Sequence, residues 1–336
     1  MGDERAIRFG VLGAARIVPR ALLQPARLIP GVEVVAIAAR DPARARQFAA
    51  LHRIPRVLPT YLDLVNALGL DAIYIPLPNS MHCEWAIRAL RAGKHVLCEK
   101  PIACNAAEAE LMAQAAAETE LFLSEGFHYQ YHPLAARVRD LICGGEIGEL
   151  VRIEAEFSAP IKPPDIRYES RLGGGATMDL GCYPLNMIRY FSGSTPEVRR
   201  ATAFTGPADI DRAMEAELEL PGGALASMKC SMAPKTRVSV FFSARGNRGA
   251  LHVTNPVAPQ LGSVLTLRRG GRETRESVSG TSTFVYQLRA FVAAVRGQTP
   301  LLTNPAEAIV NMRLIDEVYL AAGLRPRGSD GPGTAA

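Results

Sequence analysis

The sequence predicts two domains of different fold class: an α/β domain with a parallel sheet, then an α+β domain with an open, mostly antiparallel sheet that carries helices on one face. Three observations predict this. The 336 residues exceed what one ordinary hydrophobic core serves. Strands alternate with helices up to about residue 125. Strand-like runs broken by Gly, Pro and Asn dominate from about residue 145. We place the domains at 1–125 and 126–324, and a disordered tail at 325–336.

Continuous Val, Ile and Leu runs mark the strands of the first domain, because strands buried on both faces are typical of a parallel sheet. The predicted strands are 7–12, 32–39, 71–76, 96–98 and 121–125. The predicted helices are one that begins near Ile17, then 42–51, 61–68, 80–92 and 106–117. This alternation implies right-handed crossovers between parallel strands.

The second domain is predicted from runs in which apolar and polar residues alternate, so that one face of each strand is exposed to solvent. The predicted strands are 150–157, 197–204, 214–220, 224–232, 237–243, 249–253 and 264–268. Helices are predicted at 177–191, 284–295 and 305–322, and the last of these could pack back on the first domain. The open face of the sheet is a place for a second subunit, so we expect a homodimer or a homotetramer.

Composition and charge argue against several classes of function. The net charge of +5 comes from 38 basic and 33 acidic residues that are interspersed, so we expect no nucleic-acid partner. The charged start leads directly into an apolar strand, and no uninterrupted apolar span could cross a bilayer, so we expect no membrane partner and a cytoplasmic location. The six cysteines form no CxxC pair, which favours reduced thiols and no structural zinc.

A glycine turn at Gly13 follows the first strand, in the segment Gly13-Ala14-Ala15-Arg16-Ile17. In a dinucleotide-binding fold such a turn brings backbone N–H groups and a helix N-terminus against the pyrophosphate. The pattern is incomplete, since Ala15 and Val18 replace the second and third glycines. A plain tight turn before a core helix is the alternative.

The end of the second predicted strand bears on the choice between NAD and NADP. Arg40 stands where an Asp or Glu would bind the ribose 2′-hydroxyl of NAD, and Arg44 follows one helical turn later. Because arginine attracts a 2′-phosphate, we expect NADP, with NAD less favoured. Alternatively, Arg40 is a solvated strand-end residue and Asp41 only caps the next helix.

The turn after the strand at 71–76 contains Leu77, Pro78 and Asn79, with His82 three residues further on. Proline stiffens this turn and Asn79 can cap the following helix, which leaves polar groups near the place of a nicotinamide ribose. His82 is otherwise a first-turn helix residue whose ring is satisfied by a neighbour.

Three residues are candidates for acid and base chemistry. Lys100 follows Glu99 just past a buried strand, where ligands meet a parallel sheet. Asp179 and Tyr183 are four residues apart, which places both on one face of a helix, and the glycines at 173–175 allow that helix to start close against another surface. A nearby lysine would lower the pKa of the phenol. An ordinary amphipathic helix is the alternative for the Asp-Tyr pair.

His128 and His132 are also four residues apart, a spacing found in metal-binding helices. No Glu follows the first histidine, and Pro133 disfavours a helix there, so we expect no metal. Tyr129 and His132 are instead expected to line the substrate cleft, with burial in the core as the alternative for the aromatic side chains.

Five features together resemble the glucose-fructose oxidoreductase and inositol dehydrogenase family, Gfo/Idh/MocA. They are GVLGAARI, Arg40, PLPNSMH, GKHVLCEKP and DLGCYPLN, and the resemblance runs from Ile7 to about Gly323. It implies an N-terminal Rossmann domain with a doubly wound parallel sheet, a C-terminal open sheet, and catalysis in the cleft between them. Tyr183, where the family often has histidine, is similar to the branch with xylose and dihydrodiol dehydrogenases, and the segment DIRY at 165–168 resembles the same branch.

The resemblance also implies roles for individual residues. Lys100, Asp179 and Tyr183 are implied as catalytic, and Arg167 is implied at the mouth of the active site. With Tyr129 and His132, Arg167 makes up the expected substrate residues. The expected cofactor-binding residues are Gly13, Ala14, Ala15, Arg16, Ile17, Arg40, Arg44, Leu77, Pro78, Asn79, His82, Glu99 and Lys100.

The implied activity is an NADP-dependent transfer of hydride between the nicotinamide and a carbinol or ketone carbon of a sugar or cyclic polyol. Other enzymatic readings are a ketosugar reductase, a trans-dihydrodiol dehydrogenase, and a glycoside-processing enzyme that oxidises its substrate transiently. A non-enzymatic reading is a sensor or regulatory protein that holds NADP. The retained Lys100, Asp179 and Tyr183 argue against the sensor, because a sensor need not keep an acid/base set.

Overall fold

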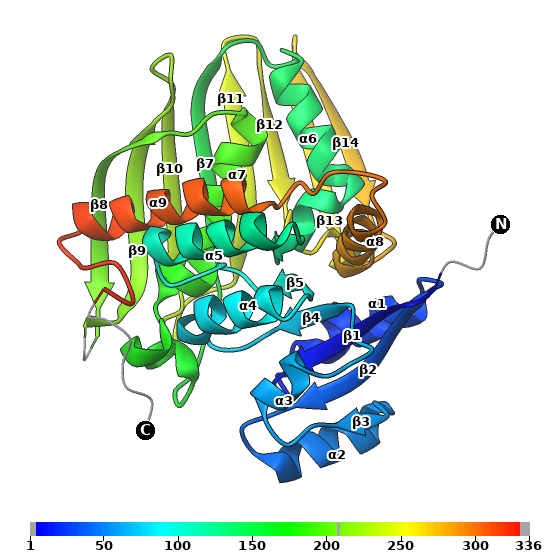
Figure 1. Cartoon of the computed structure of the whole chain (residues 1–336). Helices are drawn as coiled ribbons and strands as arrows, with labels where there is room; N and C mark the ends of the chain where they lie inside the picture. The colour runs from blue at the N-terminus through cyan, green and yellow to red at the C-terminus, as the bar shows by residue number, and fades with distance from the viewer. Residues whose placement is uncertain (1–4, 207–208, 330–336) are drawn as a thin grey trace. The chain divides into compact units, whose positions relative to one another are not determined.

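A six-stranded parallel sheet and an eight-stranded, mostly antiparallel sheet form the protein, as predicted (Figure 1). The computed structural model describes residues 5–206 and 209–329. The chain divides into two compact units. The first is formed by the segment up to Ala103, Ala107–His128 and Phe284–Ile309; the second by Cys104–Ala106, Tyr129–Thr283 and the segment from Val310.

The sheet of the first unit has the order β3-β2-β1-β4-β5-β6, the doubly wound order of a Rossmann fold. Its strands are β1 (Ile7–Leu12), β2 (Val32–Ala38), β3 (Arg56–Val57), β4 (Ala72–Ile75), β5 (His95–Cys98) and β6 (Leu123–Glu125). Its helical elements are η1 (Pro19–Leu23), α1 (Gln24–Arg27), α2 (Pro42–His52), α3 (Tyr61–Val65), η2 (Asn79–Met81), α4 (His82–Arg91) and α5 (Ala106–Thr119). The register pairs Leu12 with Ala38 and Ile75 with Cys98, so the carboxyl ends of adjacent strands lie level.

Helix α8 (Thr283–Val295) supplies part of the core of the first unit. Phe284, Leu288 and Phe291 are buried there, and the ring centroid of Phe291 lies 5.7 Å from that of Phe9 in β1. The helix expected at 305–322 is observed as α9 (Pro305–Ala321). Its residues up to Ile309 belong to the first unit and those from Val310 to the second, where Asn311 and Tyr319 have hydrogen-bond partners.

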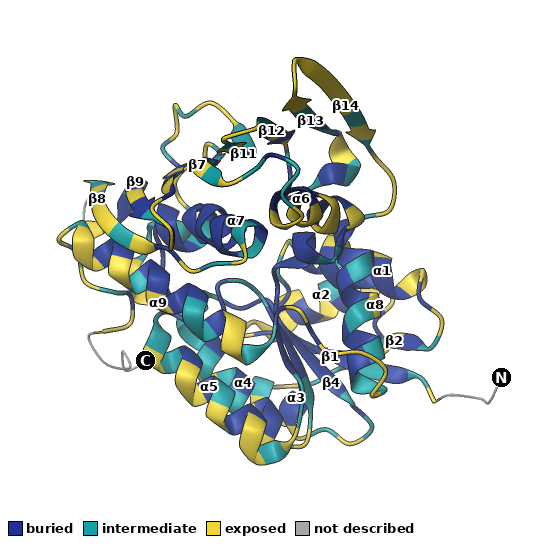
Figure 2. Cartoon of the chain, turned by 90° about the horizontal axis from the view of Figure 1, so that it is seen from above, coloured by how far each residue is buried: buried dark blue, intermediate teal, exposed yellow. Residues whose placement is uncertain are grey.

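The sheet of the second unit has the order β14-β13-β12-β11-β7-β10-β9-β8. Its strands are β7 (Leu150–Ser158), β8 (Glu197–Thr205), β9 (Asp211–Glu219), β10 (Leu225–Ser231), β11 (Ser239–Gly246), β12 (Gly249–Thr254), β13 (Ser263–Arg269) and β14 (Arg272–Val278). Strands β7 and β10 pair in parallel, whereas the other neighbours are antiparallel. Helix α7 (Cys182–Ser192) packs on β7 and β10 and is almost wholly buried, while β8 and β14 are largely exposed (Figure 2).

Two elements of this unit were missed by the sequence analysis, β14 and helix α6 (Pro133–Cys143). Pro133 was expected to disfavour helix at His132, and His132 is indeed extended, with φ −78° and ψ 140°. Pro133 itself occupies the first turn of α6, where its missing N–H costs nothing, and Nδ1 of His132 caps the helix by accepting from Leu134 N at 3.1 Å. The short helices η3 (His128–Tyr131), η4 (Ile166–Tyr168), η5 (Ser170–Leu172), η6 (Thr177–Gly181) and η8 (Pro259–Leu261) complete the elements named here.

The beginning of the predicted tail is held in place. Arg327 is buried, its guanidinium lies 2.7 Å from Oδ1 of Asp211, and it stands over the ring of Tyr319 at 4.8 Å. Disorder is therefore the wrong prediction for 325–329, because a buried carboxylate holds the arginine; residues 330–336 lie outside the described part. Within that part, no helix is long and apolar enough to cross a membrane, and no three His, Cys, Asp or Glu side chains are grouped as metal ligands.

Candidate active site

The glycine turn after β1 requires its glycine. Gly13 has φ +95°, and a Cβ at this position would lie 3.0 Å from Cδ2 of Leu77. The N–H of Gly13 donates to Ala38 O at 2.7 Å, which ties the turn to the end of β2. The turn leads into η1 and the short α1, so helix follows as predicted, although it opens with a π-helical turn. Gly13 and Leu77, two predicted cofactor residues from different loops, thus lie side by side.

Two arginines lie at the end of β2, next to the glycine turn. Arg40 is exposed, and Nη2 of Arg44 donates to Ala14 O at 2.8 Å. Asp41 does cap α2, by accepting from Ala43 N and Arg44 N, so its predicted alternative role as a cap is confirmed. The guanidinium of Arg44 therefore lies at the turn that would hold a pyrophosphate, and Arg40 follows the adjoining strand β2.

Tyr61 was not singled out from the sequence, yet it joins this group. The N–H of Arg40 donates to Oη of Tyr61 at 3.3 Å. Burial raises the pKa of Tyr61, although this hydrogen bond and the charges of Arg40 and Arg44 act in the opposite direction. Its position twenty-one residues after Arg40 carries no motif, so only the fold could bring it here.

His82 connects two loops from inside the first unit. It is fully buried, with Nδ1 3.0 Å from Pro101 O and Nε2 2.8 Å from Leu77 O. Burial lowers the pKa of His82, and the charge of Lys100 acts in the same direction, while the two carbonyl contacts oppose them. Both ring nitrogens face backbone carbonyls, so the predicted alternative, a ring satisfied within the chain, describes His82 better than direct cofactor contact.

Lys100 lies in the loop after β5, which is anchored on both sides. Oη of Tyr74 donates to Oε1 of Glu99 at 2.6 Å, and Ile102 N donates to Oε1 of Glu125 at 2.8 Å. The Lys100–Pro101 peptide bond is cis. Strand β5 neighbours β4, so the loop with Lys100 lies at the same edge of the sheet as the loop with Leu77 and Asn79.

In the second unit, the helix with Asp179 and Tyr183 does not have uniform geometry. Residues 177–181 form the π-helical η6, and the α-helix starts only at Cys182. A spacing of four places two side chains on one face only in a regular α-helix, and the segment from Asp179 to Tyr183 is not α-helical throughout. The side chain of Asp179 is 17% exposed.

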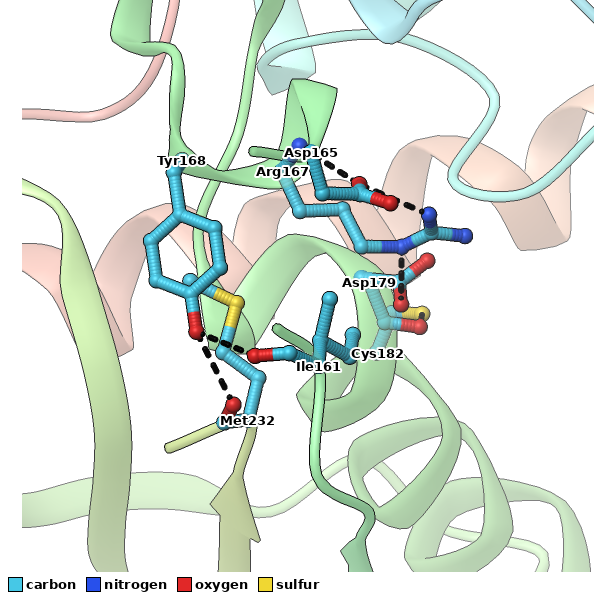
Figure 3. A network of polar contacts seen from close by, with 7 residues as sticks. All are labelled: Ile161, Asp165, Arg167, Tyr168, Asp179, Cys182 and Met232. Atoms are coloured by element: carbon cyan, nitrogen blue, oxygen red, sulfur yellow. Dashed lines mark hydrogen bonds and ion pairs between the residues drawn. The ribbon is translucent and has the colours of Figure 1, made fainter. Parts of the chain in front are cut away.

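Asp179 forms an ion pair with Arg167, the centre of a small polar network (Figure 3). Nε of Arg167 lies 2.6 Å from Oδ2 of Asp179, and Nη1 lies 3.0 Å from Oδ1 of Asp165. Burial of the guanidinium would lower its pKa, but the two carboxylates outweigh that effect and raise the pKa of Arg167. Arg167, predicted as a substrate residue, is thus joined to a predicted catalytic one.

The glycines at 173–175 allow a close approach, as predicted. A Cβ at Gly174 would lie 2.5 Å from Arg167 O, and a Cβ at Gly175, whose φ is +132°, would collide with Asp211. Gly175 N donates to Arg167 O at 2.9 Å. Asp211 is fully buried and accepts from Thr177 N at 2.7 Å at the start of the helix.

Tyr183 lies among aromatic side chains and is 5% exposed. Its ring centroid is 5.3 Å from that of Phe157 and 6.2 Å from that of Tyr129. Tyr129 is itself fully buried, and its hydroxyl donates to Oδ1 of Asn186 at 2.7 Å. These contacts favour the predicted alternative for Tyr129, burial in the core, over a position that lines the cleft. The ring of His132 contacts its own chain as the cap of α6.

The chain matches known proteins along most of its length. Residues 7–127 match the oxidoreductase family with an NAD-binding Rossmann fold, and residues 135–252 match the GFO/IDH/MocA C-terminal domain. A D-xylose 1-dehydrogenase (NADP(+)) of Haloferax volcanii is 35% identical over 94% of this chain and 97% of its own length. A dTDP-3,4-didehydro-2,6-dideoxy-alpha-D-glucose 3-reductase of Saccharopolyspora spinosa is 34% identical over 91% and 92%.

A solved structure also matches this chain along most of its length. The crystal structure of a 3-ketoreductase from Actinomadura kijaniata, in complex with NADP and TDP-benzene, matches with a TM-score of 0.88 and 32% identity over 94% of this chain and 98% of that one. Structures of variants of that reductase, with a tyrosine changed to phenylalanine or a lysine changed to alanine, match as well. The predicted resemblance is confirmed, and the chain belongs to the Gfo/Idh/MocA family of oxidoreductases.

Proposed function

We propose that this oxidoreductase uses NADP and transfers hydride to or from a carbinol or ketone carbon of a sugar or cyclic polyol. The observation that carries the proposal is the alignment of strand ends in the first unit. Gly13, Arg40 and Lys100 each follow a strand of one parallel sheet, and ligands of such sheets bind beyond the carboxyl ends of the strands.

The residues of this edge suit a dinucleotide with a 2′-phosphate. The turn at Gly13 has the backbone conformation that a close approach needs, and Arg40 and Arg44 add two cations beside it. The xylose dehydrogenase is an NADP(+) enzyme, and the crystal structure of the ketoreductase holds NADP. NADP is therefore the cofactor that we assign, in preference to NAD.

When bound, the nicotinamide accepts or supplies the hydride. The chain provides charge and proton transfer. Lys100 stabilises negative charge on the substrate oxygen through its ammonium group, and Tyr183 exchanges the hydroxyl proton through its phenol. Asp179 accepts a hydrogen bond from a neighbouring substrate hydroxyl. The variants of the ketoreductase, at a lysine and at a tyrosine, support the choice of these two residue types.

The test is turnover of a panel of aldoses, ketoses and cyclic polyols by Lys100→Ala and Tyr183→Phe. Each variant is expected to lose roughly 100- to 10,000-fold in kcat, and the double variant little more, because the two groups act on one proton and one oxygen. Lys94→Ala and Tyr190→Phe are the matched controls and should keep wild-type activity. Wild-type turnover in either test variant contradicts the proposal.

A second experiment addresses the cofactor. In Arg40→Asp the affinity for NADP is expected to fall roughly 10- to 100-fold, the range for a lost charge-assisted hydrogen bond, while affinity for NAD stays the same or rises. Arg46→Asp, on the exposed side of α2, makes the same change of charge and should leave both affinities unchanged. Equal loss of both cofactors in Arg40→Asp would contradict the preference for NADP.

We also propose that two or four copies associate through the outer face of the eight-stranded sheet. A groove of about 370 Å³ on this face is lined by residues that include Glu154, Glu217, Arg200 and Lys229, and Leu225 nearby is 50% exposed. Light scattering should show a dimer or tetramer that dissociates in Leu225→Asp. Leu68→Asp, at an exposed leucine of the first unit, is the control. A monomeric wild type contradicts this proposal.

A cytoplasmic location is part of the same proposal. None of the six cysteines, all of which lie in the described part of the chain, forms a disulfide, which suits a reducing compartment. Cell fractionation tests it, and recovery of the native protein outside the cytoplasmic fraction would contradict it.

A further inference from the structure

We propose that Arg167 is a positioning residue that fixes the carboxylate of Asp179 in one orientation and in its charged form. From the sequence, Arg167 is expected at the mouth of the active site as a substrate-binding residue. The structure points to a different role, in which its guanidinium is engaged by carboxylates of its own chain. This inference rests on the proposed function for the catalytic role of Asp179, but the contact itself does not.

The side chain of Arg167 is held from two directions. Oδ1 of Asp165 accepts from Arg167 N at 3.1 Å and from its Nη1 at 3.0 Å, so one carboxylate binds both the backbone and the guanidinium of Arg167. Nε then lies 2.6 Å from Oδ2 of Asp179. The planar guanidinium joins the two carboxylates, a geometry that the point charge of a lysine cannot reproduce.

The backbone of Arg167 is fixed as well. Its carbonyl accepts from Gly175 N, and Gly174 packs so closely that a Cβ there would lie 2.5 Å from this carbonyl oxygen. The hydroxyl of the neighbouring Tyr168 lies 2.7 Å from Ile161 O and 3.1 Å from Met232 O, and a hydrogen bond to either carbonyl anchors the turn beside the end of β10 (Figure 3). Arg167 is thus attached at both ends of its side chain before any ligand binds.

The charge of Arg167 and the partial burial of both carboxylates determine how the contact affects the ionisation of Asp179. The side chains of Asp179 and Asp165 are 17% and 11% exposed, and that of Arg167 is 35% exposed, so solvent screens the pair only in part. An adjacent cation favours the ionised carboxylate, and an arginine next to an aspartate lowers the carboxyl pKa by about 1 to 3 units. Removing the cation should therefore move the titration of Asp179 to higher pH.

The test compares Arg167→Met with Arg171→Met. Arg171 is the matched control, because it lies in the next short helix and pairs with Glu169 in an exposed ion pair at 2.9 Å. In Arg167→Met the acid limb of the pH profile of kcat/KM should move up by about 1 pH unit or more. In Arg171→Met it should stay at the wild-type pH. An unmoved acid limb in folded Arg167→Met overturns the inference.

Arg167→Lys provides a second variant in case the methionine variant does not fold. It keeps the charge but loses the planar contact, so the acid limb should move less than in Arg167→Met while kcat falls. Added guanidinium should restore part of the activity of Arg167→Met and none to Arg171→Met. A lysine variant with wild-type kcat overturns the claim that orientation matters.

A measurement without turnover separates this inference from the proposed function. The carboxyl carbon of Asp179, assigned by comparison with Asp179→Asn, can be titrated by NMR in wild type and in Arg167→Met. A higher titration midpoint in the variant supports the inference, and an unchanged midpoint overturns it. Wild-type activity in Asp179→Asn would instead contradict the proposed function and leave the NMR result valid.

Discussion

The two units differ in how they keep polar side chains in their interiors. In the first unit, His82 and His128 are buried, and burial lowers the pKa of each, which favours the uncharged imidazole. In the second unit, the buried Asp211 is matched by Arg327, and the partly exposed Asp179 is matched by Arg167. The first arrangement is vulnerable to acid, and the second to the loss of one partner.

The buried pair of the second unit predicts the largest effect on stability. Arg327→Leu leaves the fully buried Asp211 without its guanidinium, which should lower the free energy of unfolding by about 3 to 5 kcal/mol. Urea denaturation measures this, with Arg272→Leu on exposed β14 as the control. A loss below about 1 kcal/mol in Arg327→Leu would mean that the second unit does not depend on paired charge.

The buried imidazole of the first unit predicts a dependence on pH. Burial, with the charges of Lys100 and Arg20, lowers the pKa of His128 to about 3. The unfolded chain binds this proton near pH 6.5, so the contribution of His128 is complete above that pH and is lost as the pH falls towards 3. Wild type should therefore lose about 2 to 3 kcal/mol more than His128→Phe between pH 6.5 and 4.5.

Phenylalanine is the replacement for His128 because the imidazole packs on Phe284 at 4.0 Å between ring centroids. Denaturation at the two pH values measures the difference. Parallel losses in wild type and variant would show that His128 is not neutral in the folded protein, and the contrast between the units would fail.

His82 predicts a smaller effect that does not depend on salt. In His82→Leu, the imidazole N–H that donates to one of the two carbonyls, Leu77 O or Pro101 O, is lost, which should cost about 1 to 3 kcal/mol. Because the interaction that is lost is not an ion pair, the cost should be equal at low and high NaCl. A cost that shrinks at high salt would point to a charged imidazole.

The smallest effect is expected for an exposed ion pair of the first unit. Arg88 and Glu84 lie 3.0 Å apart on α4, and their side chains are 47% and 56% exposed. Arg88→Gln should change the free energy of unfolding by no more than about 0.5 kcal/mol, and high salt should remove the difference. A larger loss would mean that burial is not what distinguishes the pairs of the second unit.

Local patterns in the sequence predicted what depends on neighbours in the chain. The strand at 7–12 was placed correctly because all its side chains are apolar or small except Arg8, and the turn at Gly13 because a positive φ favours glycine. The glycines before the helix with Asp179 were interpreted correctly for the same reason. These features need only a few adjacent residues.

Features that depend on distant partners were missed. Arg327 is anchored by Asp211, which lies 116 residues earlier. The segment around Arg327 is rich in Gly, Pro and Ser, a composition that does not indicate an ordered contact. Tyr61 reaches Arg40 only through the fold. The sequence alone allows two roles for His82, because its partners are backbone carbonyls, which every residue has, and no residue type marks them. For Arg167, the motif indicated the place, but its partner, Asp179, became known only from the structure.

The packing of α8 on β1 has a consequence for protein engineering. The Rossmann sheet ends at Glu125, yet Phe9 needs Phe291 from a segment more than 150 residues later. A fragment cut after the sheet would expose an apolar face that α8 normally covers. Chimaeras that exchange the cofactor-binding unit between relatives therefore need to transplant two separate stretches, because a single crossover point would separate the face of β1 from the side chains of α8 that pack on it.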